Sequence, residues 1–158
     1  MDRFYVFLAG VAAGAAVLTV AMMISAPSLM LGEVRSAHGL DATVRILTET
    51  AEGEGWVVSS VQPLDRSVRN HGGPELRPVR LVNVCQADHA GRILGEDEAR
   101  IVSVMMPCTL SVYEKSDGSV WVGHMNPGLM GRLFGGVVSE VMAGPVAETQ
   151  ARFIDAVR

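Results

Sequence analysis

The sequence predicts an α+β domain in which helices pack on one face of a sheet that contains an antiparallel hairpin, preceded by a single transmembrane helix. Three observations predict this architecture. Residues 4–32 contain no charged residue, and a helix of about 20 residues spans the hydrocarbon core of a bilayer. Segments 109–114 and 120–124 flank an Asp-Gly turn, which is typical of a β-hairpin. Helical patterns precede and follow the strand patterns, which favours the α+β class.

The chain divides into a membrane anchor at 1–26, a stalk at 27–39 and the α+β domain at 40–158. The alternative to an anchor is a cleaved signal peptide. The best cleavage position is after Ala26, but Pro27 would follow the cut. We therefore expect a retained anchor. The balance of charged residues on its two flanks favours a cytoplasmic N-terminus and a soluble domain on the periplasmic side of a bacterial membrane.

Gly10 and Gly14 place two small side chains on one face of the anchor. This arrangement lets membrane helices approach closely, so we expect pairing with a second copy or with another protein. The alternative is that small residues are simply common in membrane helices.

The first elements of the domain are a helix and two strands. Asp41 begins an amphipathic helix that runs to about residue 54, where glycines end it. Residues 56–58 are predicted as a strand closed by Pro63. Residues 79–85 alternate between apolar and polar side chains and are predicted as a second strand.

The second half of the domain begins with a short helix at 87–94, followed by an apolar segment at 101–106. The hairpin then follows. Residues 128–143 and 145–157 are predicted as helices, because Pro145 suits the first position of a helix. Glycines in residues 128–136 indicate a helix that packs closely against its neighbours.

The net charge of −4 and the pI near 5.5 argue against a nucleic-acid-binding surface, which needs a concentrated basic patch. A domain of this size buries enough apolar surface to fold without a metal or a disulfide. Two cysteines are too few for a disulfide framework.

Five segments of the domain carry a family resemblance: Gly-Trp-Val-Val at 55–58, Arg-Leu-Val-Asn-Val-Cys-Gln at 80–86, Ala-Gly-Arg-Ile-Leu at 90–94, Met-Pro-Cys-Thr-Leu-Ser-Val-Tyr-Glu at 106–114 and Asp-Gly-Ser-Val at 117–120. They resemble the family known as domain of unknown function 302, over about residues 40–157. The chain departs from the family pattern at Gln86-Ala87, where Asn-Pro is usual, and at Thr109, where Arg is frequent. The resemblance implies a compact α+β fold able to dimerise and implies no established activity.

Cys85 and Cys108 are the strongest candidates for chemistry, because each lies near the end of a predicted element and the two elements could be neighbours in the sheet. Three interpretations remain open: two buried thiols that serve as small apolar residues, a disulfide, and a reactive pair that handles sulfur or electrons. Pro107 lacks an N–H group, so it should lie at the start of a strand or on an edge. A site centred on Cys108 would then be both fixed and reachable.

A second candidate is a soft-metal site. Thiolate, thioether and imidazole ligands suit Cu(I), and the candidate ligands here are Cys108, His124 and Met125, with Met130 and one of Met105 and Met106. Only one of Met105 and Met106 could share a site with Cys108 if both lay on a strand, because adjacent side chains point to opposite faces. No paired ligand spacing is present, so apolar packing is the alternative.

Tyr113, Glu114 and His124 form a third candidate, for acid–base chemistry, in which only one of the first two could join His124. His89 has no partner that the sequence identifies. The leading hypothesis is a membrane-anchored, non-enzymatic binding module that self-associates and needs no cofactor. The alternative is a redox, sulfur-carrier or copper-handling protein that uses Cys108 with Cys85.

Overall fold

The computed structural model describes residues 2–158, with the side chains of residues 2, 6, 9 and 22–27 outside that description. The chain forms two compact units, and the second begins at Leu31. The first unit is helix α1, Asp2–Met30. Its segment Arg3–Ala21 is long enough and apolar enough to cross a membrane. The cleavage position considered at Ala26 falls among the side chains outside the description.

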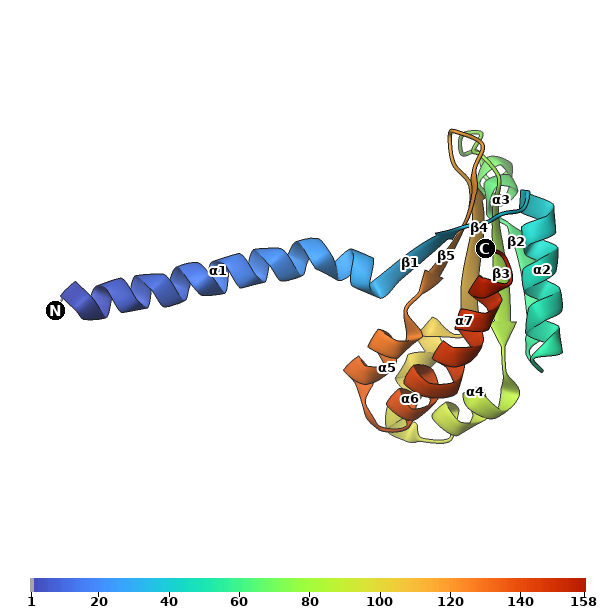
Figure 1. Cartoon of the computed structure of the whole chain (residues 1–158). Coiled ribbons are helices and arrows are strands. Elements are labelled where there is room, and N and C mark those ends of the chain that lie inside the picture. Colours follow the sequence, from blue (N-terminus) through green and yellow to red (C-terminus); the bar gives the residue numbers. More distant parts are fainter. Residues whose placement is uncertain (1) are drawn as a thin grey trace. The chain divides into compact units, whose positions relative to one another are not determined.

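The second unit is built on a five-stranded antiparallel sheet with the strand order β1-β5-β4-β3-β2 (Figure 1). The predicted hairpin is confirmed: β4 and β5 are antiparallel neighbours joined through Asp117 and Gly118. Gly118 has a φ of +79°, a conformation that glycine adopts without strain. The strands are β1 Leu31–Arg35, β2 Val57–Pro63, β3 Val79–Cys85, β4 Cys108–Glu114 and β5 Val120–Met125.

The stalk predicted at residues 27–39 is not observed as such. Helix α1 continues to Met30, and residues 31–35 form the edge strand β1. This strand pairs with β5 in the register Leu31↔Met125 to Arg35↔Trp121. The pairing joins segments about ninety positions apart, so the stabilising partner of β1 is not visible in the local sequence. The domain therefore begins directly where α1 ends.

The helices of the second unit follow the predicted order with additional breaks. The segment expected as one helix at 128–143 is divided at Gly135, whose φ is +71°. The predicted break before Pro145 is observed, because Gly144 directly before it has non-helical backbone angles, and the last α-helix begins at Ala147. The elements are α2 Leu40–Gly53, α3 Leu64–Asn70, α4 Ala87–Leu94, the 3-10 helix η1 Asp97–Met105, α5 Pro127–Phe134, α6 Gly136–Val141, the π-type turn η2 Met142–Val146 and α7 Ala147–Asp155.

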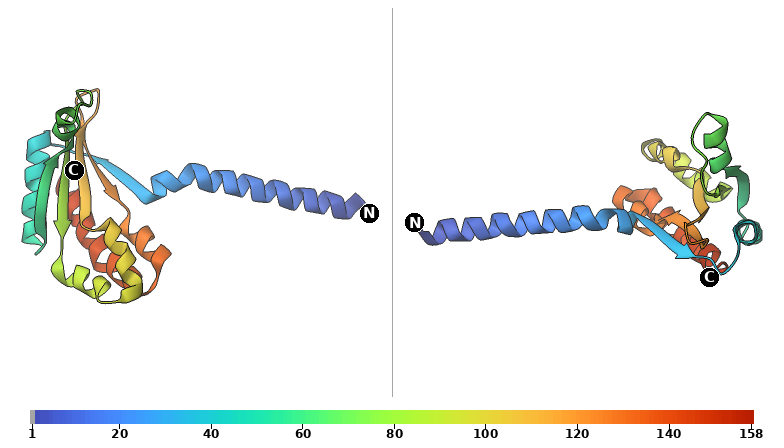
Figure 2. Two further views of the ribbon diagram at one scale, coloured as in Figure 1. Left: turned by 180° about the vertical axis from the view of Figure 1, so that it is seen from behind. Right: turned by 90° about the horizontal axis from the view of Figure 1, so that it is seen from above.

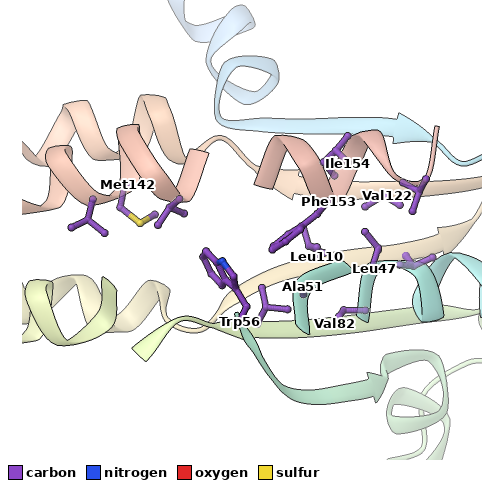
Figure 3. Close-up of a cluster of buried hydrophobic side chains, with 14 of the residues drawn as sticks. Leu47, Ala51, Trp56, Val82, Leu110, Val122, Met142, Phe153 and Ile154 are labelled. Carbon is purple, nitrogen blue, oxygen red and sulfur yellow. The ribbon is translucent and has the colours of Figure 1, made fainter. Parts of the chain in front are cut away.

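The hydrophobic core lies between the sheet and helices α2 and α7 (Figure 3). Alternate positions of the central strands, such as Val82 and Leu110, are almost completely buried. Leu47 of α2 and Phe153 of α7 cover them. Trp56 closes this core at one end, with its ring edge-on to Phe153 at 5.6 Å between centroids. Figure 2 shows the ribbon of the sheet and its helices from behind and from above.

Close packing at Gly131 joins α5 to the segment after α6. A Cβ atom built on Gly131 would lie 2.9 Å from the Ala143 nitrogen and 2.9 Å from the Met142 Cβ. Only glycine therefore fits between these elements. The glycine-containing helix expected at 128–136 is confirmed as a closely packed segment, and this packing fixes the position of Met142.

Candidate functional site

The register of β3 and β4 brings the two cysteines to the same end of neighbouring strands. Cys108 is the Cα partner of Val84, and Cys85 is the next residue of β3. Strand β4 begins at Cys108 directly after Pro107, which confirms the position predicted for the proline. Both thiols are free and half-buried. The predicted neighbourhood of the two cysteines is therefore observed, without a disulfide.

A narrow cavity of about 30 Å³ opens at this end of the sheet. Its walls come from the ends of β3 and β4, from helix α4, from η1 and from the α6–η2 segment, and Trp56 forms part of one side. A cavity needs roughly 10–15 Å³ to hold a water molecule, whereas pockets for organic ligands occupy roughly 300–1,000 Å³. This cavity therefore has room for a water-sized group or a single ion.

Sulfur atoms dominate the chemistry of the cavity walls. Five sulfur-containing side chains line it: Cys85, Cys108, Met105, Met106 and Met142. The expectation that only one of Met105 and Met106 could share a site with Cys108 is wrong. Met105 ends the helix η1 and Met106 lies in the extended segment after it, so the alternation of a strand does not apply. We call this cavity the sulfur pocket.

Helix α4 presents one face to the sulfur pocket. Gln86, His89, Ala90 and Ile93 line it at the spacing i, i+3, i+4, i+7 that defines a helical stripe. The Gln86 side chain caps the helix by accepting the His89 N–H at 2.8 Å. The His89 ring lies edge-on to Trp56 at 5.9 Å between centroids. Sequence reasoning missed this contact, although the periodicity of 86–93 carries the signal.

A second cavity of about 10 Å³ shares Cys108 with the sulfur pocket and is lined also by Gln150. The Gln150 Nε2 atom lies 3.0 Å from His124 Nδ1 and donates to the Met125 carbonyl oxygen at 2.9 Å. Neither His124 nor Met125 lines the sulfur pocket. The structure therefore does not bring His124 and Met125 together with Cys108 in one cavity, and Gln150 occupies the space between them.

Burial controls the protonation of the site. It raises the pKa of the Cys108 thiol from an ordinary value of 9.0 to about 11, and the neighbouring Cys85 adds to the shift. A thiol must lose its proton before it attacks an electrophile. Cys108 is therefore protonated and weakly nucleophilic near neutral pH.

The acid–base group considered at Tyr113, Glu114 and His124 does not assemble. Tyr113 donates a hydrogen bond to Glu33, and Glu114 accepts one from Arg77 at 3.0 Å. Burial and the bond to Glu33 raise the pKa of Tyr113 to about 12. Tyr113 therefore ties β4 to the edge strand β1, and Glu114 ties β4 to the segment before β3. Neither residue is paired with His124, whose partner in β4 is Leu110.

A metal ion at the sulfur pocket would need the thioethers as ligands. Within residues 2–158 as described, no group of three or more His, Cys, Asp or Glu side chains is placed to hold a metal ion. A metal at the sulfur pocket would take the two cysteines and the methionines as ligands. These ligands are soft and exclude hard cations such as Ca²⁺ and Mg²⁺, which need oxygen atoms.

Comparisons with known proteins agree with this architecture. The family model described as "Domain of unknown function DUF302" matches residues 32–157. The crystal structure of an uncharacterized conserved DUF302 protein from Bacillus stearothermophilus is similar, with a TM-score of 0.72 and 22% identity over 82% of this chain and 99% of that chain. A search of the curated proteins found no match.

Proposed function

The chain belongs to the DUF302 family, whose description assigns no activity, and from this premise we propose that it is a membrane-anchored binding module that holds a small ligand in the sulfur pocket. The observation that carries this proposal is the convergence of five separate elements on one apolar cavity. The cavity that they enclose has room for a water-sized group or a single ion.

The protonation state of Cys108 favours binding over catalysis. An enzyme or sulfur carrier that forms a covalent bond through Cys108 needs the thiolate at working pH. Burial instead raises the pKa of this thiol to about 11. The redox or sulfur-carrier alternative therefore ranks second.

The anchor and self-association complete the proposal. Segment Arg3–Ala21 has the length and composition of a membrane span, and we place the domain on the periplasmic side. Gly10 and Gly14 place two small residues on one face of this helix, an arrangement that lets a second membrane helix approach closely. The proposed assembly is a homodimer held in part by α1.

Size-selective thiol modification tests the pocket. The full chain carrying Cys85→Ser, kept in detergent, leaves Cys108 as the single thiol. We expect methyl methanethiosulfonate, which is small and uncharged, to react with the folded protein, and a maleimide carrying a polymer chain to react only after unfolding. The ratio of the two rates, measured folded and unfolded, cancels the effect of the raised thiol pKa.

Two results would contradict the pocket. If neither reagent reacts before unfolding, Cys108 is sealed in the core and the cavity binds nothing from solution. If both react at the same relative rates in the folded and the unfolded chain, Cys108 is an ordinary surface thiol. The matched variant Cys108→Ser with Cys85 retained reports how far the neighbouring thiol shares the same access.

A further inference from the structure

The side chains that line the sulfur pocket indicate which kind of ion it binds, whereas its volume indicates only that the ion is small. Two thiols and three thioethers line one cavity with room for one ion. Soft thiolate and thioether ligands suit Cu(I), zinc and iron–sulfur clusters. Two cysteines are too few for an iron–sulfur cluster, which takes four. The methionines are placed by unrelated features: Met105 and Met106 by the end of η1, and Met142 by the close contact with Gly131.

Charge balance favours a monovalent cation. The walls of the sulfur pocket are mostly apolar side chains, such as Trp56, Ile93 and Val102, and a net charge there costs free energy. One thiolate with one Cu⁺ ion is neutral, and thioethers complete the shell without adding charge. Zn²⁺ is usually held by four Cys, His or carboxylate ligands in structural sites, and no group of even three such side chains is assembled in the described chain.

Resting on the proposed binding function, we infer that the sulfur pocket is a Cu(I) site in which the Cys108 thiolate is the anionic ligand. The thioethers of Met105 and Met106 and the sulfur of Cys85 are the further ligands available, and Met142 lies beside them. Binding replaces one proton: the Cys108 S–H bond breaks, the sulfur–copper bond forms and one H⁺ leaves to solvent. No electron is transferred, because copper enters and remains as Cu(I).

The other titratable groups that line the sulfur pocket are Cys85 and His89. A metal ion deprotonates a coordinating thiol outright, so the proton released on binding is the one on Cys108.

Competition with a chromophoric Cu(I) chelator tests the inference. The full chain in detergent is titrated without oxygen, with ascorbate to keep the copper reduced. We expect the protein to withdraw one equivalent of Cu(I) from bicinchoninate. Cys108→Ser should weaken binding by at least about 100-fold, and the double variant Met105→Leu, Met106→Leu by about 10-fold, by analogy with losses measured when the surroundings of a metal are altered.

Met130→Leu is the matched control, because Met130 is buried but does not line the pocket. It should bind Cu(I) as the unmodified chain does. X-ray absorption at the copper edge of the unmodified protein keeps the test decisive if a variant fails to fold. The inference requires sulfur neighbours only, and nitrogen or oxygen ligands would overturn it.

The outcomes separate the two proposals. If the chain takes up no Cu(I), or Cys108→Ser binds it equally well, the copper site is wrong. The binding module nevertheless survives if the small thiol reagent enters the folded pocket and the bulky one does not. If the chain takes up no Cu(I) and neither reagent enters, both proposals fail.

Discussion

The imidazole ring of His124 lies across Gly32, its Cα partner in the β1–β5 ladder. A Cβ atom built on Gly32 would lie 2.7 Å from both the Cε1 and the Nε2 atoms of this ring. The glycine therefore lets the edge strand pass over a side chain whose Nδ1 atom faces Gln150 at 3.0 Å. Strand β1, strand β5 and helix α7 meet at this point.

Gly32→Ala should lower the free energy of unfolding by about 1–2 kcal/mol, because the ring must rotate and give up its contact with Gln150. Chemical denaturation of the full chain in detergent measures the change. Gly91→Ala is the control: it lies in α4, a Cβ there meets nothing within 4 Å, and it should stabilise the helix by about 0.5–1 kcal/mol. Equal effects of the two substitutions would show that His124 does not restrict Gly32.

A second prediction concerns Asn83, which is buried on β3 and joins three strands through its side chain. Its Oδ1 accepts a hydrogen bond from Thr109 Oγ1 at 2.7 Å, and its Nδ2 donates to Ser60 Oγ at 3.0 Å. Asn83→Ala should cost about 1–3 kcal/mol of stability, because both bonds are lost and two hydroxyls are left to find water. Thr109→Val alone should cost less.

The double variant Asn83→Ala, Thr109→Val separates this pair from its surroundings. We expect a coupling energy of about 0.5–1.5 kcal/mol from the cycle of single and double variants. Strict additivity would mean that the bond between the two side chains contributes nothing.

The extent to which the sequence predicted these features depends on how local their causes are. The hairpin was predictable because Asp117-Gly118 fixes the turn through its own backbone preferences. The neighbouring positions of Cys85 and Cys108 followed from two recognisable strand ends. Strand β1 was not predictable, because its only strand partner, β5, lies about ninety positions away.

The methionines of the sulfur pocket show the same limit. The sequence predicted only an apolar segment for Met105 and Met106, and this segment before Pro107 forms a 3-10 helix in which Ile101 and Val104 are exposed at 73% and 85%. Its apolar pattern resembles that of a buried strand. Met142 lines the pocket and packs against Gly131 in a tertiary contact that no local pattern encodes. The sulfur pocket could not be predicted from the sequence, because five elements that are separate along the chain come together only in the folded domain.

The third prediction is a pH dependence of stability at Cys108. Burial raises the pKa of its thiol from 9.0 to about 11 in the folded chain. The folded state therefore holds the proton where the unfolded state has released it, and stability contributed below pH 9.0 is lost as the pH rises toward 11. The loss has an upper limit of about 1.4 kcal/mol per pH unit.

Denaturation curves of the unmodified chain and of Cys108→Ser, measured across this pH range, isolate the thiol. Other groups that titrate there, including Tyr113, contribute to both proteins and cancel in the difference. The difference between the two should shrink as the pH increases. A constant difference would show that the Cys108 thiol has the same pKa in the folded and the unfolded chain.

The last prediction places the boundary between anchor and domain at Leu31. A chain that starts at Leu31 keeps strand β1 and should be water-soluble and folded, because this segment is a compact unit by itself.

A chain that starts at Leu40 lacks β1 and exposes the edge of β5, together with the His124 side chain that Gly32 covers in the full chain. Unpaired strand edges associate with other chains, so this shorter chain should have a lower unfolding temperature and form aggregates in size-exclusion chromatography. The full chain should remain in the membrane fraction after alkaline carbonate washing, as a helical anchor requires. If the chains starting at Leu31 and Leu40 are equally stable and monomeric, residues 31–39 act as a stalk after all, and β1 is not part of the domain in solution.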